Sequence, residues 1–259
     1  MGSKPAVLVT RPAGQGATLM DALRARGFSA FEQPLLEIQS LSGPQPQLDR
    51  TLAQLDKYQH IIFISGNAVR LGMARILAVW PQLPGDIPVY AIGYSTAEML
   101  RGYALAPISA GEPMTSESLL AVEELQNVAG QRVLIVKGLG GRSTLAEALS
   151  LRGAEVEDFA CYQRRCPVLE PGELAAKIAR WEINLLLISS GEGLCNLLTL
   201  LGPAETIKLS AMPLIVPSMR VARMAEDAGF NTVYTADNAS NTAMLEMVER
   251  SSLMAEKNK

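Results

Sequence analysis

Residues 7–27, VLVTRPAGQGATLMDALRARG, recur later in the chain as residues 133–153, VLIVKGLGGRSTLAEALSLRG. Aligned at an offset of 126, the two stretches are identical at nine of 21 positions. Each begins with an apolar run typical of a buried strand, passes through a glycine-containing loop, and continues as a helical pattern that a glycine ends. The sequence therefore predicts a strand–loop–helix unit that occurs twice.

Three further blocks repeat in the same order and at nearly the same spacing. A period of about 125 residues is the size of a domain and is too long for a solenoid repeat. The chain is therefore an internal duplication of one domain-sized unit. The repeated pairs are 61–65 with 185–189, 89–100 with 214–225, and 118–124 with 243–249.

Within each copy, short runs rich in Val, Ile and Leu alternate with amphipathic helical stretches. Such runs without polar alternation are typical of strands buried on both faces, and alternating strands and helices favour a parallel sheet covered by helices. We therefore predict an α/β fold with two such sheets. In the first copy we expect strands at 7–10, 29–37, 60–64, 87–92 and 105–109, and helices at 15–26, 48–56, 66–79, 95–102 and 116–126.

Two Pro- and Gly-rich breaks, QSLSGPQPQ at 39–47 and RRCPVLEPG at 164–172, occupy equivalent places after the second strand of each copy. They predict two domains that exchange their first strand–helix–strand unit and are joined by a two-stranded linker. The alternative is a tandem arrangement split near residue 130. The predicted domains are 1–38 plus 168–259 and 45–162, with linkers at 39–44 and 163–167.

Composition excludes several classes of protein. With 48% hydrophobic and 19% charged residues, the chain can bury a core, and its net charge of −3 does not favour a nucleic-acid partner. The apolar runs are too short to span a membrane and the start lacks a secretory signal, so we expect a soluble cytoplasmic protein. Three cysteines argue against a disulfide framework. The single histidine, His60, argues against a metal cluster, and we expect it on a solvated loop or strand edge.

Polar loops follow the predicted strands, at the edge where ligands bind in open parallel sheets. Their Ser, Thr, Asn and Gly residues are typical helix caps and leave backbone N–H groups free to bind anions. The loop KGLGGRS at 137–143 lacks the third glycine of a dinucleotide motif, so we expect no nucleotide, and no other cofactor. Candidate cations in these loops are Arg11, Lys137, Arg142 and Arg220, and candidate neutral groups are Ser65, Asn67, Ser95, Thr96, Gly138, Ser189, Ser190 and Ser218.

The motifs VLVTRPAGQG, FISGNAV, YAIGYSTAE, VLIVKGLGGR, CYQRR, ISSGEGL and IVPSMRVA, in that order, resemble the uroporphyrinogen-III synthase family over essentially the whole chain. The resemblance implies a cofactor-free, monomeric lyase with two flavodoxin-like α/β domains and an active site in the cleft between them. It also implies a cyclising dehydration in tetrapyrrole (heme) biosynthesis. The substrate would be hydroxymethylbilane, a linear tetrapyrrole with eight carboxylates, and a transient contact with hydroxymethylbilane synthase would deliver it.

The resemblance also implies roles for individual residues. Tyr162 matches the family's tyrosine at the end of the second strand of copy two, where a phenol could donate a proton to the departing hydroxyl; the alternative is a tyrosine that packs the hinge. Ser65 and Thr96 match family positions in one domain, and Ser189 and Ser218 do so in the other. At Arg220 the chain departs from relatives that carry two threonines. Two readings of other classes stay open: a two-lobed ligand-binding sensor and a nucleotide-sugar enzyme.

Overall fold

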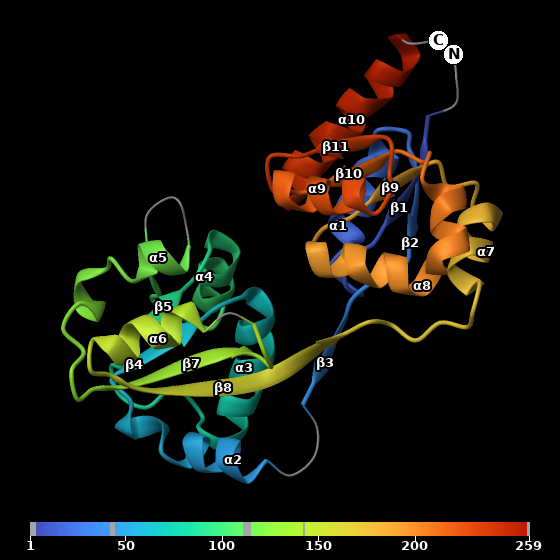
Figure 1. Ribbon diagram of the computed structural model, residues 1–259. Coiled ribbons are helices and arrows are strands. Elements are labelled where there is room, and N and C mark those ends of the chain that lie inside the picture. The colour runs from blue at the N-terminus through green and yellow to red at the C-terminus, as the bar shows by residue number, and fades with distance from the viewer. Residues whose placement is uncertain (1–3, 42–44, 111–114, 142, 258–259) are drawn as a thin grey trace. The chain divides into compact units, whose positions relative to one another are not determined.

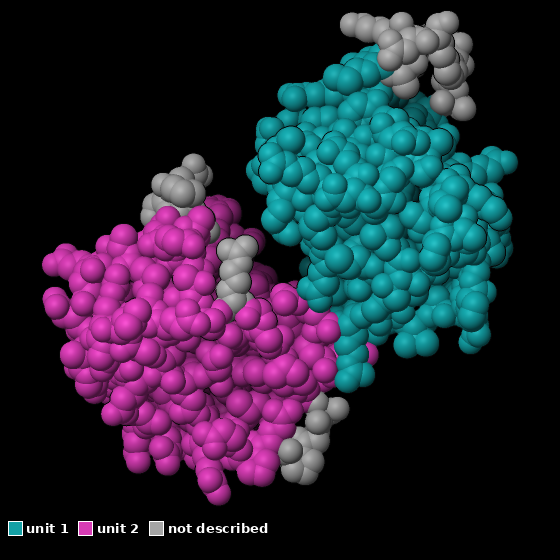
Figure 2. Space-filling view, viewed as in Figure 1, with its two compact units in different colours: residues 1–37, 165–259 teal, residues 38–164 magenta. Residues whose placement is uncertain are grey.

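The structure is a computed structural model that describes residues 4–41, 45–110, 115–141 and 143–257. The chain divides into two compact units, shown in different colours in Figure 2. Unit 1 combines residues 1–37 with 165–259, and unit 2 holds residues 38–164. Each unit contains a largely parallel sheet flanked by helices, so the predicted α/β class is confirmed.

Unit 1 contains a five-stranded sheet in the order β11-β10-β9-β1-β2, with every pair of neighbours parallel. Strand β1 comes from the start of the chain and lies between β2 and β9, so it pairs with a strand from the second half of the chain. The strands are β1 (Ala6–Val9), β2 (Ser29–Glu32), β9 (Leu185–Leu187), β10 (Leu214–Val216) and β11 (Val233–Thr235). The helices are α1 (Ala17–Ala25), α7 (Glu173–Arg180), α8 (Gly191–Leu209), α9 (Met219–Asp227) and α10 (Asn241–Lys257).

The apolar run of β1 explains why this sheet is covered on both faces. Val7, Leu8 and Val9 are fully buried. Successive side chains on a strand point to opposite faces. Leu8 accordingly packs in the cluster formed with α7, α8 and α9, whereas Val7 and Val9 pack in the cluster formed with α1 and α10. The first strand thereby joins two separate apolar layers into one unit.

Unit 2 contains a six-stranded sheet in the order β3-β8-β7-β4-β5-β6 (Figure 1). Helices α2, α3 and α4 pack on one face, and α5 and α6 on the other. The strands are β3 (Glu37–Ser40), β4 (His60–Phe63), β5 (Val89–Ala91), β6 (Ile108–Ser109), β7 (Arg132–Gly138) and β8 (Glu155–Arg165). The helices are α2 (Pro46–Ala53), η1 (Leu55–Lys57), α3 (Gly66–Val79), α4 (Tyr94–Arg101), α5 (Ser116–Leu119), η2 (Glu123–Leu125) and α6 (Thr144–Leu151).

The chain passes between the units through two strands. Where one strand was expected at 29–37, the structure has two: β2 belongs to the sheet of unit 1, and β3 begins at Glu37 and belongs to the sheet of unit 2. The segments expected as linkers, 39–44 and 163–167, overlap the ends of β3 and β8, and residues 42–44 lie outside the described residues. The alternative split near residue 130 is wrong, because β4 and β7, on either side of that point, pair in one sheet.

His60 differs from its expected solvated position. It is the first residue of β4 and is only 6% exposed. Its Nδ1 atom lies 2.9 Å from the Tyr90 hydroxyl, and its Nε2 atom lies 2.6 Å from Oε1 of Gln131. These partners lie on or next to the neighbouring strands, so the imidazole is a buried polar group with a partner on each nitrogen.

Candidate functional site

In unit 2, the carboxyl end of β4 leads directly into the cap of α3. Ser65 has an extended backbone, with φ −165° and ψ 162°, and its hydroxyl accepts a hydrogen bond from the N–H of Ala68 at 3.1 Å. Gly66 and Asn67 are the first two helical residues, and both are partly exposed. The first turn of α3, with its N–H groups and the positive end of its dipole, therefore opens at this edge of the sheet.

Tyr162, at the same edge on β8, reaches this cap. Its hydroxyl lies 3.1 Å from Oγ of Ser65, and the residue is only 3% exposed. The ring packs against the backbone of Gly138, at the end of β7, where a β-carbon would fall 2.6 Å from Cε2 of the ring. Tyr162, Ser65 and Gly138, three candidates from the sequence, are therefore in direct contact with one another through the tyrosine.

Unit 1 repeats this cap at an offset of 125, one residue beyond Ser189, which the alignment of 61–65 with 185–189 pairs with Ser65. Ser190 is the N-cap of α8, and its hydroxyl accepts a hydrogen bond from the N–H of Gly193 at 3.0 Å. A β-carbon on Gly191 would fall 3.3 Å from the sulfur of Met224, just as one on Gly66 would fall 2.7 Å from the sulfur of Met99. Each unit therefore places a methionine from the next helix over a glycine at a serine-capped helix start.

Arg220 makes the two caps differ in charge. Its position in unit 1 corresponds to Ser95 in unit 2 at the repeat offset of 125. A β-carbon on Gly191 would lie 3.1 and 3.3 Å from the two terminal nitrogens of Arg220, and Nη1 lies 3.4 Å from the sulfur of Met224. An exposed guanidinium thus stands beside the first turn of α8, which strengthens the positive field of that helix start.

Arg11 lies at the carboxyl end of β1, next to β9, which leads to the candidates Ser189 and Ser190. Its Nη2 atom donates a hydrogen bond to the carbonyl of Ala239, just before α10. Its Nε atom is buried without a hydrogen-bond partner, as is Oδ1 of Asn241, the first residue of α10. Burial lowers the pKa of Arg11 from its usual value. A partly buried guanidinium with unused donor capacity is suited to contact a carboxylate.

Lys137 does not belong to the exposed loop in which the sequence placed it. It lies within β7 and is only 8% exposed. Its Nζ atom lies 2.9 Å from Oδ2 of Asp158 on the neighbouring strand β8. The predicted position in an exposed loop is therefore wrong: Lys137 lies in a strand, and its charge is paired with that of Asp158 along the sheet.

The remaining predicted residues that the structure describes lie at or next to the starts of helices. Ser95 and Thr96 lie in the first turn of α4, Ser95 exposed and Thr96 only 2% exposed. Ser218 is the N-cap of α9, but its side chain makes no capping hydrogen bond. Ser189 is half-buried directly after β9, and Arg142 lies outside the described residues.

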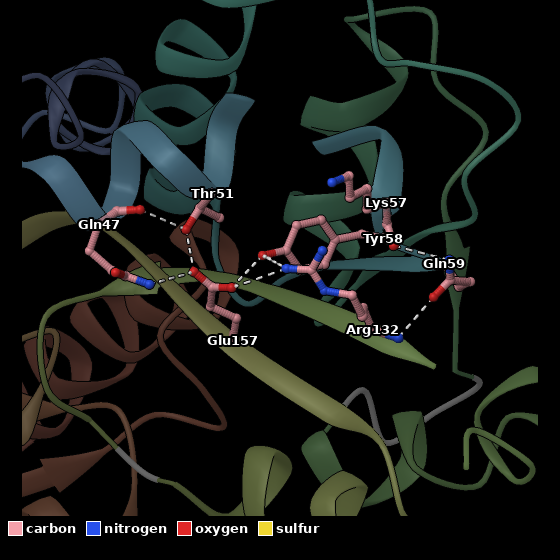
Figure 3. Close-up of polar contacts among 7 residues, drawn as sticks. All are labelled: Gln47, Thr51, Lys57, Tyr58, Gln59, Arg132 and Glu157. Carbon is pink, nitrogen blue, oxygen red and sulfur yellow. Dashed lines mark hydrogen bonds and ion pairs between the residues drawn. The ribbon is translucent and has the colours of Figure 1, made fainter. Parts of the chain in front are cut away.

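A second polar cluster surrounds Glu157 (Figure 3), and no motif in the sequence points to it. Thr51 and Tyr58 donate hydrogen bonds to its carboxylate, Gln47 does so at 3.4 Å, and Arg132 pairs with it at 3.7 Å. Burial raises the pKa of Glu157, but these hydrogen bonds and the charge of Arg132 outweigh it and lower the pKa. Arg132 and Glu157 lie near the starts of β7 and β8, so this cluster holds α2 at the opposite edge from Tyr162.

Other kinds of site find no support in the part of the chain that the structure describes. It contains no group of three His, Cys, Asp or Glu side chains placed to hold a metal ion. Nor does it contain a helix with the length and hydropathy needed to cross a bilayer. Cys161 is buried beside Tyr162, and burial raises the pKa of its thiol to about 12, so it stays protonated and is a poor nucleophile.

Comparison with known proteins identifies a family that has the same fold. The family model described as uroporphyrinogen-III synthase HemD matches residues 17–246. The uroporphyrinogen-III synthases of Escherichia coli (strain K12) and Salmonella typhimurium are 36% and 35% identical over 251 residues, covering 94% of this chain and 99% of each relative. Two solved structures share the fold. A mutant uroporphyrinogen III synthase from the extremely thermophilic bacterium Thermus thermophilus is 19% identical, with a TM-score of 0.61 over 96% of this chain and 98% of that one. The enzyme from Helicobacter pylori 26695 is 17% identical, with a TM-score of 0.60 over 96% and 99%.

Proposed function

The chain belongs to the uroporphyrinogen-III synthase family, and from that premise we propose that its serine-capped loops fold hydroxymethylbilane for ring closure. The family's function, the formation of uroporphyrinogen III in tetrapyrrole biosynthesis, is the function of this chain, and the enzyme is a hydro-lyase. The family implies hydroxymethylbilane as the substrate. The proposal concerns how this chain's own residues carry out the reaction.

The reaction loses one water and forms one ring. Departure of the hydroxyl from ring A leaves an electrophilic azafulvene, which the substituted carbon of ring D attacks to give a spiro intermediate. Fragmentation and recombination invert ring D before the macrocycle closes as uroporphyrinogen III. The unassisted substrate closes without inversion to isomer I. The enzyme must therefore hold one folded conformation and stabilise charge as it develops.

Helix starts with free N–H groups suit a substrate that carries eight carboxylates. The starts of α3 and α8 each present such groups beside a serine cap, and Arg220 and Arg11 add positive charge in unit 1. Together they supply the local positive field that a chain of net charge −3 needs to bind a polyanion. We propose that the helix starts of each unit bind carboxylates of the substrate.

Tyr162 is the proposed proton donor to the departing hydroxyl. Its contact with Ser65 supports this assignment, because a serine hydroxyl can accept or donate and so can fix the direction in which the phenol points. The low exposure of Tyr162 also supports the alternative of a packing residue. Removing the phenol oxygen distinguishes the two assignments, because it should slow turnover for a proton donor and leave the turnover rate unchanged for a packing residue.

The finer parts of the proposal concern assembly and location. We propose that the domains 1–38 plus 168–259 and 45–162 fold as separate bodies, with 39–44 and 163–167 as the hinge. A cofactor-free monomer in the cytoplasm agrees with the family resemblance. A transient contact with hydroxymethylbilane synthase would shorten the time in which the substrate can close unassisted.

The experiment that tests the function generates hydroxymethylbilane in the assay, adds the chain, and separates the oxidised isomers. We expect isomer III to dominate at a rate that depends on the protein concentration. A sensor protein would bind the tetrapyrrole and leave isomer I as the product. That result would overturn the proposal.

A further inference from the structure

Three exposed apolar side chains lie at the carboxyl edges of the two sheets. Leu139 follows β7 and is 57% exposed, Tyr94 is the first residue of α4 and is 65% exposed, and Met219 is the first residue of α9 and is 61% exposed. None of the three was a candidate in the sequence, since a single exposed apolar residue carries no signal. Their common position at the carboxyl ends of strands requires an explanation.

Leu139 and Tyr94 flank the Ser65 cap in unit 2. The strands β7, β4 and β5 are adjacent in that order, and they lead to Leu139, Ser65 and Tyr94. At about 4.8 Å per strand, the two apolar side chains start about 10 Å apart, with the capped helix start between them. The backbone N–H of Leu139 donates to the carbonyl of Tyr162 at 2.6 Å, so the backbone of the loop is fixed beside the phenol while its side chain faces solvent.

Met219 provides a counterpart in unit 1. At the repeat offset of 125 it corresponds to Tyr94, and both residues begin the helix of the repeated block that pairs 89–100 with 214–225. The residue after Met219 is Arg220, which lies over the start of α8. An exposed apolar side chain therefore stands near a serine-capped helix start in each unit, although the side chains themselves differ.

We propose that Leu139, Tyr94 and Met219 hold pyrrole rings of the tetrapyrrole while the neighbouring helix starts hold its carboxylates. The inference rests on the proposed function. Each ring of the substrate is an apolar face that carries acidic arms, and an apolar side chain beside N–H donors matches that pattern. Burying such a side chain against a ring adds binding free energy that does not depend on charge. These residues thereby select a ring-bearing polyacid over a simple polyanion.

The chain contains a matched control for each unit. Leu151 is 89% exposed at the end of α6, and Ile207 is 74% exposed near the end of α8. Because both helices run back toward the starts of the next strands, these two side chains lie at the opposite edges of the same sheets. Replacing them therefore tests the effect of losing an exposed apolar side chain that lies away from the proposed ring contacts.

The experiment compares Leu139→Ser, Tyr94→Ser and Met219→Ser with Leu151→Ser and Ile207→Ser. We expect the first three to raise KM for hydroxymethylbilane by about five- to tenfold each and to increase the share of isomer I, while the two controls match wild type. The rise in KM should be the same at about 0.05 and 0.5 M salt, because apolar contacts are not screened. Leu139→Met, which keeps apolar volume, should retain most of the affinity.

Three results would separate the explanations. Loss of isomer III in the wild-type assay would overturn the proposed function itself. If the wild type forms isomer III but the three edge variants have the same KM and isomer ratio as the controls, the proposed ring contacts are overturned and the proposed function stands. A rise in KM that disappears at high salt would assign the effect to charge and would also overturn them. Unfolding midpoints measured for all variants identify any that fail to fold, for which Leu139→Gln, Tyr94→Asn and Met219→Gln replace the serine substitutions.

Discussion

The ring of Tyr162 lies so close to the backbone of Gly138 that a β-carbon there would fall 2.6 Å from Cε2 and 3.1 Å from the hydroxyl oxygen. The glycine at the end of β7 is therefore a steric requirement of the tyrosine on β8. This contact alone accounts for a glycine at the start of the glycine-rich loop of the second repeat.

Gly138→Ala should displace the Tyr162 ring. We expect a loss of about 1–3 kcal/mol in the free energy of unfolding, because the surrounding core is closely packed, and a lower kcat. Urea unfolding and single-turnover assays measure the two effects. In the double variant with Tyr162→Leu, the two stability losses should be less than additive. Strict additivity would show that the clash is relieved elsewhere.

Tyr162→Phe should lower kcat while leaving KM nearly unchanged, if the phenol gives its proton to the leaving hydroxyl. General-acid catalysis contributes about 10²–10⁴-fold, and a good leaving group needs less. The measurement is single turnover with separation of the isomers. A variant that turns over at the wild-type rate, with isomer III dominant, would leave Tyr162 as a packing residue.

Ser65→Ala and Ser190→Ala form a matched pair. Each removes one helix cap, so each should cost about 0.5–2 kcal/mol in the free energy of unfolding. Only Ser65 contacts Tyr162, and only its removal should change kcat and the pH dependence of kcat. Binding should change little in either, because backbone donors remain. Equal effects on kcat would show that the Ser65–Tyr162 contact has no catalytic role.

Arg220→Gln should raise KM more at low salt than at high salt, since an exposed charge is screened by ions. Its stability should match wild type, because Arg220 is exposed and makes no ion pair among those described. Lys137→Met should behave in the opposite way, with KM unchanged and stability altered through the lost pair with Asp158. A salt-dependent KM in the Lys137 variant would contradict the structural role assigned to it.

Glu157→Gln should reduce stability at neutral pH by about 1–3 kcal/mol, the cost of weakening hydrogen bonds to a partly buried charge. The pKa of Glu157 is lowered in the folded state, so its carboxylate adds stability above the unfolded value of about 4.3. That contribution is lost as the pH falls through the folded-state pKa, and the variant and wild type should then converge. Glu98→Gln, which breaks an exposed pair with Arg101, is the control and should change stability little at any pH.

The repeat and the apolar runs were enough to predict the α/β class and most strands, because those signals are local. The predictions that were wrong concern features that depend on contacts between residues far apart in the sequence. The expected helix at 116–126 ends early, since Arg152 donates to the carbonyls of Leu120 and Leu125 and holds the chain in two short turns. Lys137 and His60 were misplaced for the same reason, because their partners lie on neighbouring strands that sequence spacing does not reveal.

The site was predicted in part. Serine caps have a sequence signature, so Ser65 and Ser190 could be found from the residues alone. The contact between Tyr162 and Gly138 depends on the register of two strands, and the methionines over Gly66 and Gly191 depend on helix packing. The exposed Leu139, Tyr94 and Met219 became visible only once the sheet edges were known.

The placement of β1 between β9 and β2 also bears on how the protein is made. A ribosome completes unit 2 once residue 164 has emerged, while β1 still lacks β9, the strand after residue 165 that pairs with it. A strand that is synthesised before unit 2 is thus buried after it. During that interval the apolar residues of β1 are accessible to chaperones and proteases, and synthesis that stops after residue 164 leaves a folded unit carrying an unpaired N-terminal arm.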